Sequence, residues 1–208
     1  MLQFITHHTD RYDEITGTRA VLEGGCRWIQ LRMKEAPAET FLRTGREVGR
    51  LCRQYGATFI LDDRVEFVAE LGADGVHLGK NDLPVAEARR RLGPAALLGA
   101  TANTFADIER AAAAGADYIG LGPFRFTRTK SNLSPLLGIG GYRTIMAQCR
   151  TAGIALPVVA IGGITAPDVA GILATGTSGI ALSGALLSAE DPAEETRKII
   201  EIITHSKS

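Results

Sequence analysis

Short apolar runs recur along this 208-residue chain at fairly even spacing, and this repetition constrains the fold more than any other feature. Each run is mostly apolar on both faces, which is typical of a buried parallel strand. Amphipathic segments rich in Ala, Leu, Arg and Glu lie between the runs. We expect strands at residues 2–6, 28–31, 58–61, 75–78, 97–100, 118–121, 158–161 and 179–182. The clearest helical segments are residues 38–55, 85–92, 105–114, 141–152 and 194–204.

Strict alternation of strands and helices predicts a parallel sheet. Eight such units equal the count of a (β/α)8 barrel, and 208 residues lies near the lower limit for that fold. The main competitor is a doubly wound open sheet, which often carries GxGxxG after its first strand; here the first run ends Thr6-His7-His8. No Pro/Ser-rich linker divides the chain. We therefore expect an α/β fold in which residues 1–208 form a single-domain (β/α)8 TIM barrel.

Capping signals mark the ends of the expected helices. Thr104 and Thr165 can cap the segments that follow them. Pro84 and Pro167 stand near first-turn positions, where a missing N–H costs little. Glycines that we expect to close helices in the left-handed conformation are Gly56, Gly72, Gly93, Gly115, Gly153 and Gly176.

The charge balance disfavours several classes of function. Lys plus Arg equals Asp plus Glu at 23 each, which argues against broad nucleic-acid or membrane binding but leaves room for a local cationic pocket. Cys26, Cys52 and Cys149 form no CxxC pair, so neither a disulfide framework nor a zinc site is indicated. With no secretory signal and no long apolar run, we expect a soluble cytoplasmic protein that binds small molecules. The sequence leaves its oligomeric state open.

Polar residues or glycines follow every apolar run from the second onward. In a (β/α)8 barrel these positions meet at the carboxyl ends of the strands, where active sites lie. In chain order they are Gln30, Arg32 and Lys34; Asp62 and Asp63; His77 and Asp82; Thr101; Thr127, Thr129 and Lys130; Gly162 and Gly163; and Ser183 and Gly184. Individually, some have structural readings, such as a helix cap at Asp62 or Asp63 and a core histidine at His77.

The residue types indicate two anion sites. Asp63 and Asp82 follow neighbouring strands, and Mg²⁺ is typically held by one or two carboxylates plus substrate phosphates. Arg32, Lys34 and Lys130 carry the positive charge that a polyphosphate needs, and the hydroxyls of Thr127 and Thr129 can donate to phosphate oxygens. The glycines after the seventh and eighth strands free backbone N–H groups, as in the monophosphate site common in these barrels.

Five segments carry a family resemblance. They are QLRMK at 30–34, LDDR at 61–64, GVHLGKND at 75–82, GPFRFTRTK at 122–130 and AIGGI at 160–164. In this order and spacing they resemble the thiamine-phosphate synthase family, also called thiamine-phosphate pyrophosphorylase, from Gln30 to about Leu186. AIGGI alone is shared with many phosphate-binding barrels.

The resemblance implies a transferase that joins hydroxymethylpyrimidine diphosphate to hydroxyethylthiazole phosphate in a dissociative, Mg²⁺-assisted substitution. The implied products are thiamine phosphate and diphosphate. The implied pyrimidine-diphosphate residues are Gln30, Arg32, Lys34, Asp62, Thr101 and Lys130, of which Lys34, Thr101 and Lys130 are also the implied catalytic residues. The implied thiazole-phosphate residues are Thr127, Thr129, Gly162, Gly163, Ser183 and Gly184, and the implied Mg²⁺ ligands are Asp63 and Asp82.

Three positions depart from the family pattern. Asp62 stands where the family usually has Asn, and a carboxylate repels diphosphate unless a metal or a cation intervenes. Asp62 is therefore expected to bind Mg²⁺ or to pair with Arg64 or Lys80. Thr101 replaces a serine and keeps the hydroxyl, whereas Gly184 stands at a serine position and Ser183 lies one residue earlier.

Other functions remain as alternatives. A thiazole tautomerase has the same barrel and uses an acid–base histidine, but it does not need the full diphosphate set. A phosphate-sugar epimerase or isomerase shares AIGGI but has no reason to carry TRTK with QLRMK. A non-catalytic thiamine-related ligand-binding protein is favoured only by Asp62. Residues 125–138 form a long polar connection that we expect to act as a lid over both substrates.

Overall fold

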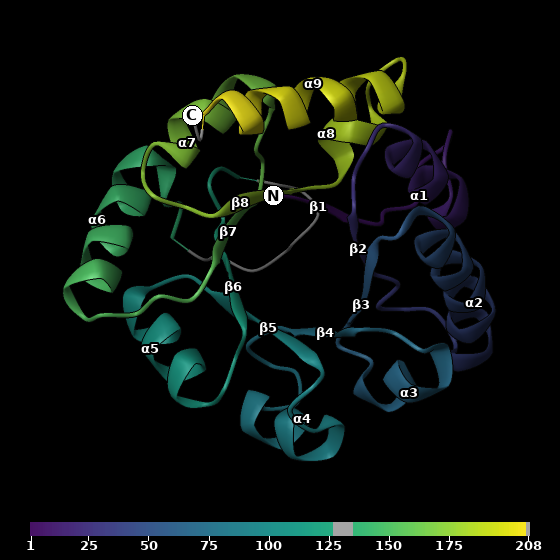
Figure 1. Cartoon of the computed structure of the whole chain (residues 1–208), viewed down its shortest axis with the longest axis horizontal. Coiled ribbons are helices and arrows are strands. Elements are labelled where there is room, and N and C mark those ends of the chain that lie inside the picture. Colours follow the sequence, from purple (N-terminus) through teal and green to yellow (C-terminus); the bar gives the residue numbers. More distant parts are fainter. Residues whose placement is uncertain (127–134, 207–208) are drawn as a thin grey trace.

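A closed barrel of parallel strands forms the centre of the molecule (Figure 1). The computed structural model describes residues 1–126 and 135–206. In them, eight strands pair in sequence order, and β8 closes the barrel against β1. The strands are β1 (Leu2–Ile5), β2 (Trp28–Leu31), β3 (Thr58–Asp62), β4 (Gly75–Leu78), β5 (Leu97–Ala102), β6 (Tyr118–Leu121), β7 (Val158–Ile161) and β8 (Gly179–Leu182). The barrel expected from the sequence is confirmed.

Helices surround the barrel on its outside (Figure 1). They are α1 (Glu14–Glu23), α2 (Ala38–Tyr55), α3 (Val68–Leu71), α4 (Val85–Leu92), α5 (Phe105–Ala113), α6 (Gly138–Thr151), α7 (Val169–Leu173), α8 (Gly184–Leu187) and α9 (Pro192–His205). Among the described residues, no helix is long and apolar enough to cross a membrane.

Two layers of apolar side chains explain why the strands are apolar on both faces. Ile60 and Val159 point into the barrel, where they belong to a cluster with Ile5, Tyr118 and Ala181. The strand neighbours of Ile60, which are Phe59 and Leu61, belong to the larger cluster between the sheet and the helices. Alternation along each strand thus places one side chain in each layer, as strand geometry requires.

Most of the expected helix ends are found. Thr104 is the N-cap of α5 and its hydroxyl accepts from the Asp107 N–H at 3.2 Å; Thr165 is the N-cap of a 3₁₀ turn. Gly56 and Gly72 end α2 and α3 in the left-handed conformation, whereas Gly93, at φ 79° and ψ −179°, lies outside it. Helix α9 begins before the expected residue 194 because the Asp191 side chain accepts from two backbone N–H groups of its first turn.

Candidate diphosphate and metal site

The side chains of Gln30, Arg32 and Lys34 converge on Asp62, the last residue of β3. Gln30 donates to Asp62 Oδ1 at 3.1 Å, and Arg32 Nε lies 3.4 Å from Asp62 Oδ2. The Asp62 side chain is only 8% exposed, so these contacts replace water around its charge. Gln30 on β2 and Arg32 and Lys34 just after it therefore direct their side chains to one place, at the carboxyl ends of β2 and β3.

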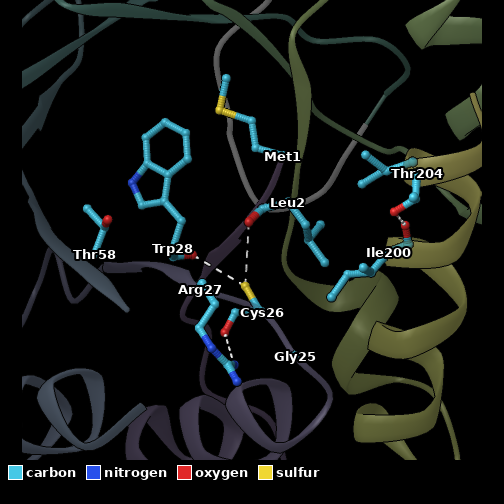
Figure 2. Close-up of a pocket in the computed structure, with 10 residues that line it drawn as sticks. Met1, Leu2, Gly25, Cys26, Arg27, Trp28, Thr58, Ile200 and Thr204 are labelled. Atoms are coloured by element: carbon cyan, nitrogen blue, oxygen red, sulfur yellow. Dashed lines mark hydrogen bonds between the residues drawn. The ribbon is translucent and has the colours of Figure 1, made fainter. Parts of the chain in front are cut away.

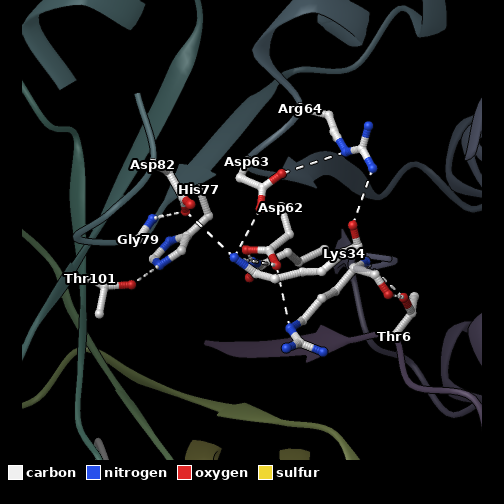
Figure 3. Close-up of polar contacts among 11 residues, drawn as sticks. Thr6, Lys34, Asp62, Asp63, Arg64, His77, Gly79, Asp82 and Thr101 are labelled. Atoms are coloured by element: carbon white, nitrogen blue, oxygen red, sulfur yellow. Dashed lines mark hydrogen bonds and ion pairs between the residues drawn. The ribbon is translucent and has the colours of Figure 1, made fainter. Parts of the chain in front are cut away.

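Lys34 links the aspartates of two neighbouring strand ends (Figure 3). Its Nζ lies 2.9 Å from Asp63 Oδ2, 3.6 Å from Asp82 Oδ2 and 3.9 Å from Asp62 Oδ2. Burial alone lowers the pKa of the Lys34 ammonium, but the Asp63 hydrogen bond and the three carboxylate charges outweigh burial and raise the pKa. Lys34 is therefore charged at neutral pH, and the three acidic side chains face one cation.

Asp63 has an unusual backbone. Among the described residues it is the one non-glycine with positive φ, at 63°. Its N–H donates to the His77 carbonyl at 2.9 Å, and Arg64 Nε lies 3.7 Å from its Oδ1. Left-handed backbone at a non-glycine residue tends to occur at functional sites, and it aims this carboxylate at Lys34. The following 3₁₀ turn (Val65–Phe67) has Arg64 as its N-cap, so the alternative that Asp62 or Asp63 caps it is wrong.

Asp82 is held by a tight turn after β4. The Gly79 N–H donates to Asp82 Oδ2 at 2.6 Å, and the Asp82 N–H donates to the Gly79 carbonyl at 3.2 Å. A Cβ at residue 79 would lie 2.7 Å from Asp82 Oδ2, so glycine is needed for this approach. The same Oδ2 atom lies 3.6 Å from Lys34 Nζ, so the turn directs this carboxylate toward the site.

The donor set fits a magnesium ion. Asp63 and Asp82 share one ammonium at 2.9 and 3.6 Å, so their carboxylates already converge on one point. Within residues 1–126 and 135–206, no group of three or more His, Cys, Asp or Glu side chains is arranged to hold a metal. Two carboxylates suit Mg²⁺, which keeps several waters and takes further ligands from substrate phosphates. Asp63 and Asp82 are thus the candidate ligands for it.

An ion pair between an exposed lysine and a buried aspartate lies next to the turn after β4. Lys80 Nζ lies 2.6 Å from Asp107 Oδ2, and this carboxylate oxygen also accepts from the N–H groups of Asn103 and Thr104. Burial alone would raise the pKa of Asp107, but the Lys80 hydrogen bond and the backbone N–H groups lower it to about 2. The sequence analysis missed this pair. The spacing of Thr104 and Asp107 signals a capping box, but nothing in the sequence indicates Lys80 as its partner.

The Asp62 partners differ from those expected. Arg64 pairs with Asp63, and Lys80 pairs with Asp107. The expectation that Asp62 pairs with Arg64 or Lys80 is therefore wrong, because Arg32 and Lys34 reach it from the segment that follows β2.

His77 is a hydrogen-bonded residue of the barrel interior. Its Nδ1 lies 2.9 Å from the Tyr118 hydroxyl and its Nε2 lies 3.0 Å from the Thr101 hydroxyl. Gly120 leaves room for the ring, since a Cβ there would lie 2.8 Å from His77 Cε1. These contacts favour the interpretation of His77 as a hydrogen-bonded core residue rather than a catalytic one. They also hold the Thr101 hydroxyl beside the pocket. The pocket lining includes Gln30, Arg32, Lys34, Asp62, His77 and Thr101.

Gln30 offers a ligand an acceptor in this pocket. It is 2% exposed, and its Oε1 has no hydrogen-bond partner among the described residues. Because buried polar atoms are usually paired, a donor from a bound molecule is the natural partner for it.

The glycine loops after β7 and β8 lie side by side, because these strands pair directly. Gly162 and Gly163 have φ of 98° and 68°, and a Cβ at residue 162 would lie 2.8 Å from Pro123 Cα. Ser183 is the N-cap of α8, and a Cβ at Gly184 would meet open space. Backbone there is open to a ligand. Thr127, Thr129, Lys130 and most of the expected lid lie outside the described residues.

The loop after β7 is hydrogen-bonded to Arg125, which lies in the segment after β6. Arg125 donates to the Gly163 carbonyl at 3.0 Å and makes two bonds of 2.7 Å to Asp168. The Asp168 pKa falls to about 2 because Arg125 hydrogen bonds to the carboxylate. Arg125 therefore holds the loop at Gly163 and at Asp168. The sequence gives no sign of either contact.

A larger cavity, whose lining residues are drawn in Figure 2, lies at the amino-terminal ends of β1, β2 and β3, which begin at Leu2, Trp28 and Thr58. Its volume is about 510 Å³ and its lining includes Cys26, Trp28 and Ile200. The Arg27 guanidinium there donates to the carbonyls of Leu22 and Cys26, both at 2.8 Å. Burial raises the pKa of the Cys26 thiol to about 11. With its guanidinium engaged and its thiol protonated, this cavity does not suit a phosphorylated substrate.

The family model and the curated relatives agree on one family. The family model described as thiamine monophosphate synthase matches residues 2–186. A thiamine-phosphate synthase of Phocaeicola vulgatus is 57% identical over 201 residues, which cover 97% of each chain. A thiamine-phosphate synthase of Flavobacterium psychrophilum is 44% identical over 191 residues, which cover 92% of this chain and 93% of that protein.

A solved structure supports the same grouping. Thiamine phosphate pyrophosphorylase from Pyrococcus furiosus matches this fold with a TM-score of 0.87 and 34% identity. The match covers 100% of this chain and 96% of that one. From its sequence and its fold, the chain belongs to the thiamine monophosphate synthase family.

Proposed function

We propose that this chain joins hydroxymethylpyrimidine diphosphate to hydroxyethylthiazole phosphate, which gives thiamine phosphate and diphosphate. Family membership supports the reaction class, a transferase of thiamine biosynthesis. The single observation that carries the site assignment is the convergence of Asp63, Asp82 and Lys34 at the carboxyl ends of β2 to β4. Carboxylates for a metal and cations for a diphosphate meet there.

The leaving group determines what the site must do. Diphosphate departs readily only when its negative charge is neutralised. Mg²⁺ held by Asp63 and Asp82 would supply part of that neutralisation. Arg32 and Lys34 supply the rest by donating to diphosphate oxygens, and Lys130 joins them by its position in the TRTK segment.

The pyrimidine ring is oriented by neutral groups. Gln30 Oε1, which has no partner among the described residues, accepts a hydrogen bond from the ring's amino group. The Thr101 hydroxyl, which is hydrogen-bonded to His77, lines the same pocket. Departure of diphosphate leaves a pyrimidine-methyl cation, which the thiazole nitrogen attacks. Because this step needs no strong base, a His77 ring bonded to Tyr118 and Thr101 is compatible with it.

The thiazole phosphate is placed at the loops after β7 and β8. Backbone N–H groups of Gly162, Gly163, Ser183 and Gly184 are the proposed donors, and the hydroxyls of Thr127 and Thr129 in the TRTK segment are further proposed donors. A cytoplasmic location is part of this proposal, since the cysteines are free thiols that suit a reducing compartment.

One assay tests the proposal. Purified protein is mixed with both substrates and Mg²⁺, with and without chelator, and thiamine phosphate is measured. We expect product that depends on Mg²⁺. Folded protein that forms no product refutes the proposal, and isomerisation of the thiazole precursor by the same protein would point to the tautomerase instead.

A further inference from the structure

We propose that Lys34 is the resident counter-ion of the metal site, so that a divalent cation must displace its ammonium before it binds Asp63 and Asp82. The displaced ammonium then becomes available to the diphosphate. This inference rests on the proposed function, because it takes these two aspartates as the metal ligands.

The first argument is the position of the Lys34 ammonium. It lies 2.9 Å from Asp63 Oδ2 and 3.6 Å from Asp82 Oδ2, between the two carboxylates that face each other from β3 and β4 (Figure 3). The side chains of Asp63 and Asp82 are only 19% and 18% exposed. Partly buried like charges repel strongly, so a cation between them stabilises the site when no metal is bound.

The second argument is that Mg²⁺ and the Lys34 ammonium cannot occupy the same space. Mg²⁺ binds carboxylate oxygens at about 2.0–2.1 Å, so it needs the space that the ammonium fills. Two cations at the same pair of oxygens would also repel each other. Metal binding and the present position of Lys34 are therefore mutually exclusive.

The third argument is that Lys34 is able to move. Its side chain is 34% exposed and has a flexible four-carbon stem, whereas its backbone carbonyl is held by Arg64 at 3.2 Å. The ammonium can swing toward the open mouth without moving β2. A diphosphate bound there would receive it, so metal and diphosphate should strengthen each other's binding through Lys34, as linkage requires.

The test measures metal affinity without substrate. Mn²⁺, a hard cation that takes the same oxygen ligands, is titrated into protein and the free ion is followed by its electron paramagnetic resonance signal. We expect Lys34→Met to bind Mn²⁺ at least about tenfold tighter than the wild type, because one repelling charge next to the site is removed. Lys34→Gln is a second variant if Lys34→Met does not fold.

Arg32→Met is the matched control. It removes the same charge, but among the described residues Arg32 pairs with Asp62 and with neither Asp63 nor Asp82. We expect its Mn²⁺ affinity to rise by less than about threefold. Adding Asp63→Asn to Lys34→Met should abolish the gain.

The outcomes separate the two proposals. Equal or weaker Mn²⁺ binding by Lys34→Met, in a wild type that makes thiamine phosphate, overturns the displacement and leaves the proposed function intact. A gain as large in Arg32→Met also overturns it, since net charge alone would then explain the effect. If none of the proteins binds Mn²⁺, the metal site fails, and this inference fails with it.

Discussion

Replacing Asp62 by Asn should tighten the binding of diphosphate. The Asp62 carboxylate lies 3.4 Å from Arg32 Nε and 3.9 Å from Lys34 Nζ, so a diphosphate must take both cations from it. Asparagine has nearly the same shape and still accepts from Gln30. The substitution therefore removes the competing charge and leaves the packing in place.

The size of the effect follows from the contacts. A phosphate oxygen bonded to the far side of Arg32 or Lys34 would lie about 6 Å from the carboxylate, where two unit charges repel by about 3 kcal/mol at an effective dielectric constant of about 20. Solvent and the bound metal reduce this figure. We therefore expect an affinity gain of about ten- to a hundredfold, or about 1.4–2.7 kcal/mol.

Calorimetric titration of inorganic diphosphate in the presence of Mg²⁺ measures this gain. Glu70→Gln is the control, because it removes the same charge from an exposed pair with Arg46. Unchanged affinity would refute the reasoning. Weaker binding together with a lower Mg²⁺ affinity would instead make Asp62 a metal ligand.

Three further predictions follow. Lys130→Ala should lower turnover by orders of magnitude, with an unchanged circular dichroism spectrum; near-normal turnover would remove this residue from the site. Asp107→Asn should cost about 2 kcal/mol of unfolding free energy at pH 7, measured in urea, because the Lys80 pair lowers the Asp107 pKa from 3.8 to about 2. Since the folded pKa is depressed, that difference should be full above pH 4 and vanish as the pH falls through about 2; a pH-independent difference contradicts it. Tyr118→Phe should cost roughly 1–3 kcal/mol and lower the melting temperature by about 2–12 °C, because the buried Nδ1 of His77 loses its partner; an unchanged melting temperature would exclude this role.

The fold was accessible from the sequence because the barrel repeats one unit. Apolar runs, capping residues such as Thr104 and closing glycines such as Gly56 are local signals, and each strand end is then placed by topology. Helices α3, α7 and α8 span only 4, 5 and 4 residues, which is too short to show a helical apolar period, although Gly72 marks the end of α3. Helix α1 contains Gly17 and several β-branched residues, which weaken its helical pattern.

The candidate site could be predicted only in part from the sequence. That Gln30, Arg32 and Lys34 share a face follows from the period of a strand. Which carboxylate each one meets depends on how β2 and β3 are staggered, and the sequence does not show this. The same holds for the Lys80–Asp107 pair, whose partners come from the turn after β4 and the first turn of α5.

A crystal structure with Mg²⁺ and inorganic diphosphate bound tests the site assignment most directly. We expect the metal between Asp63 and Asp82, with Lys34 turned away from these carboxylates and, like Arg32, bonded to diphosphate oxygens. A metal held by other residues, or a diphosphate seated only at the glycine loops after β7 and β8, would contradict the account.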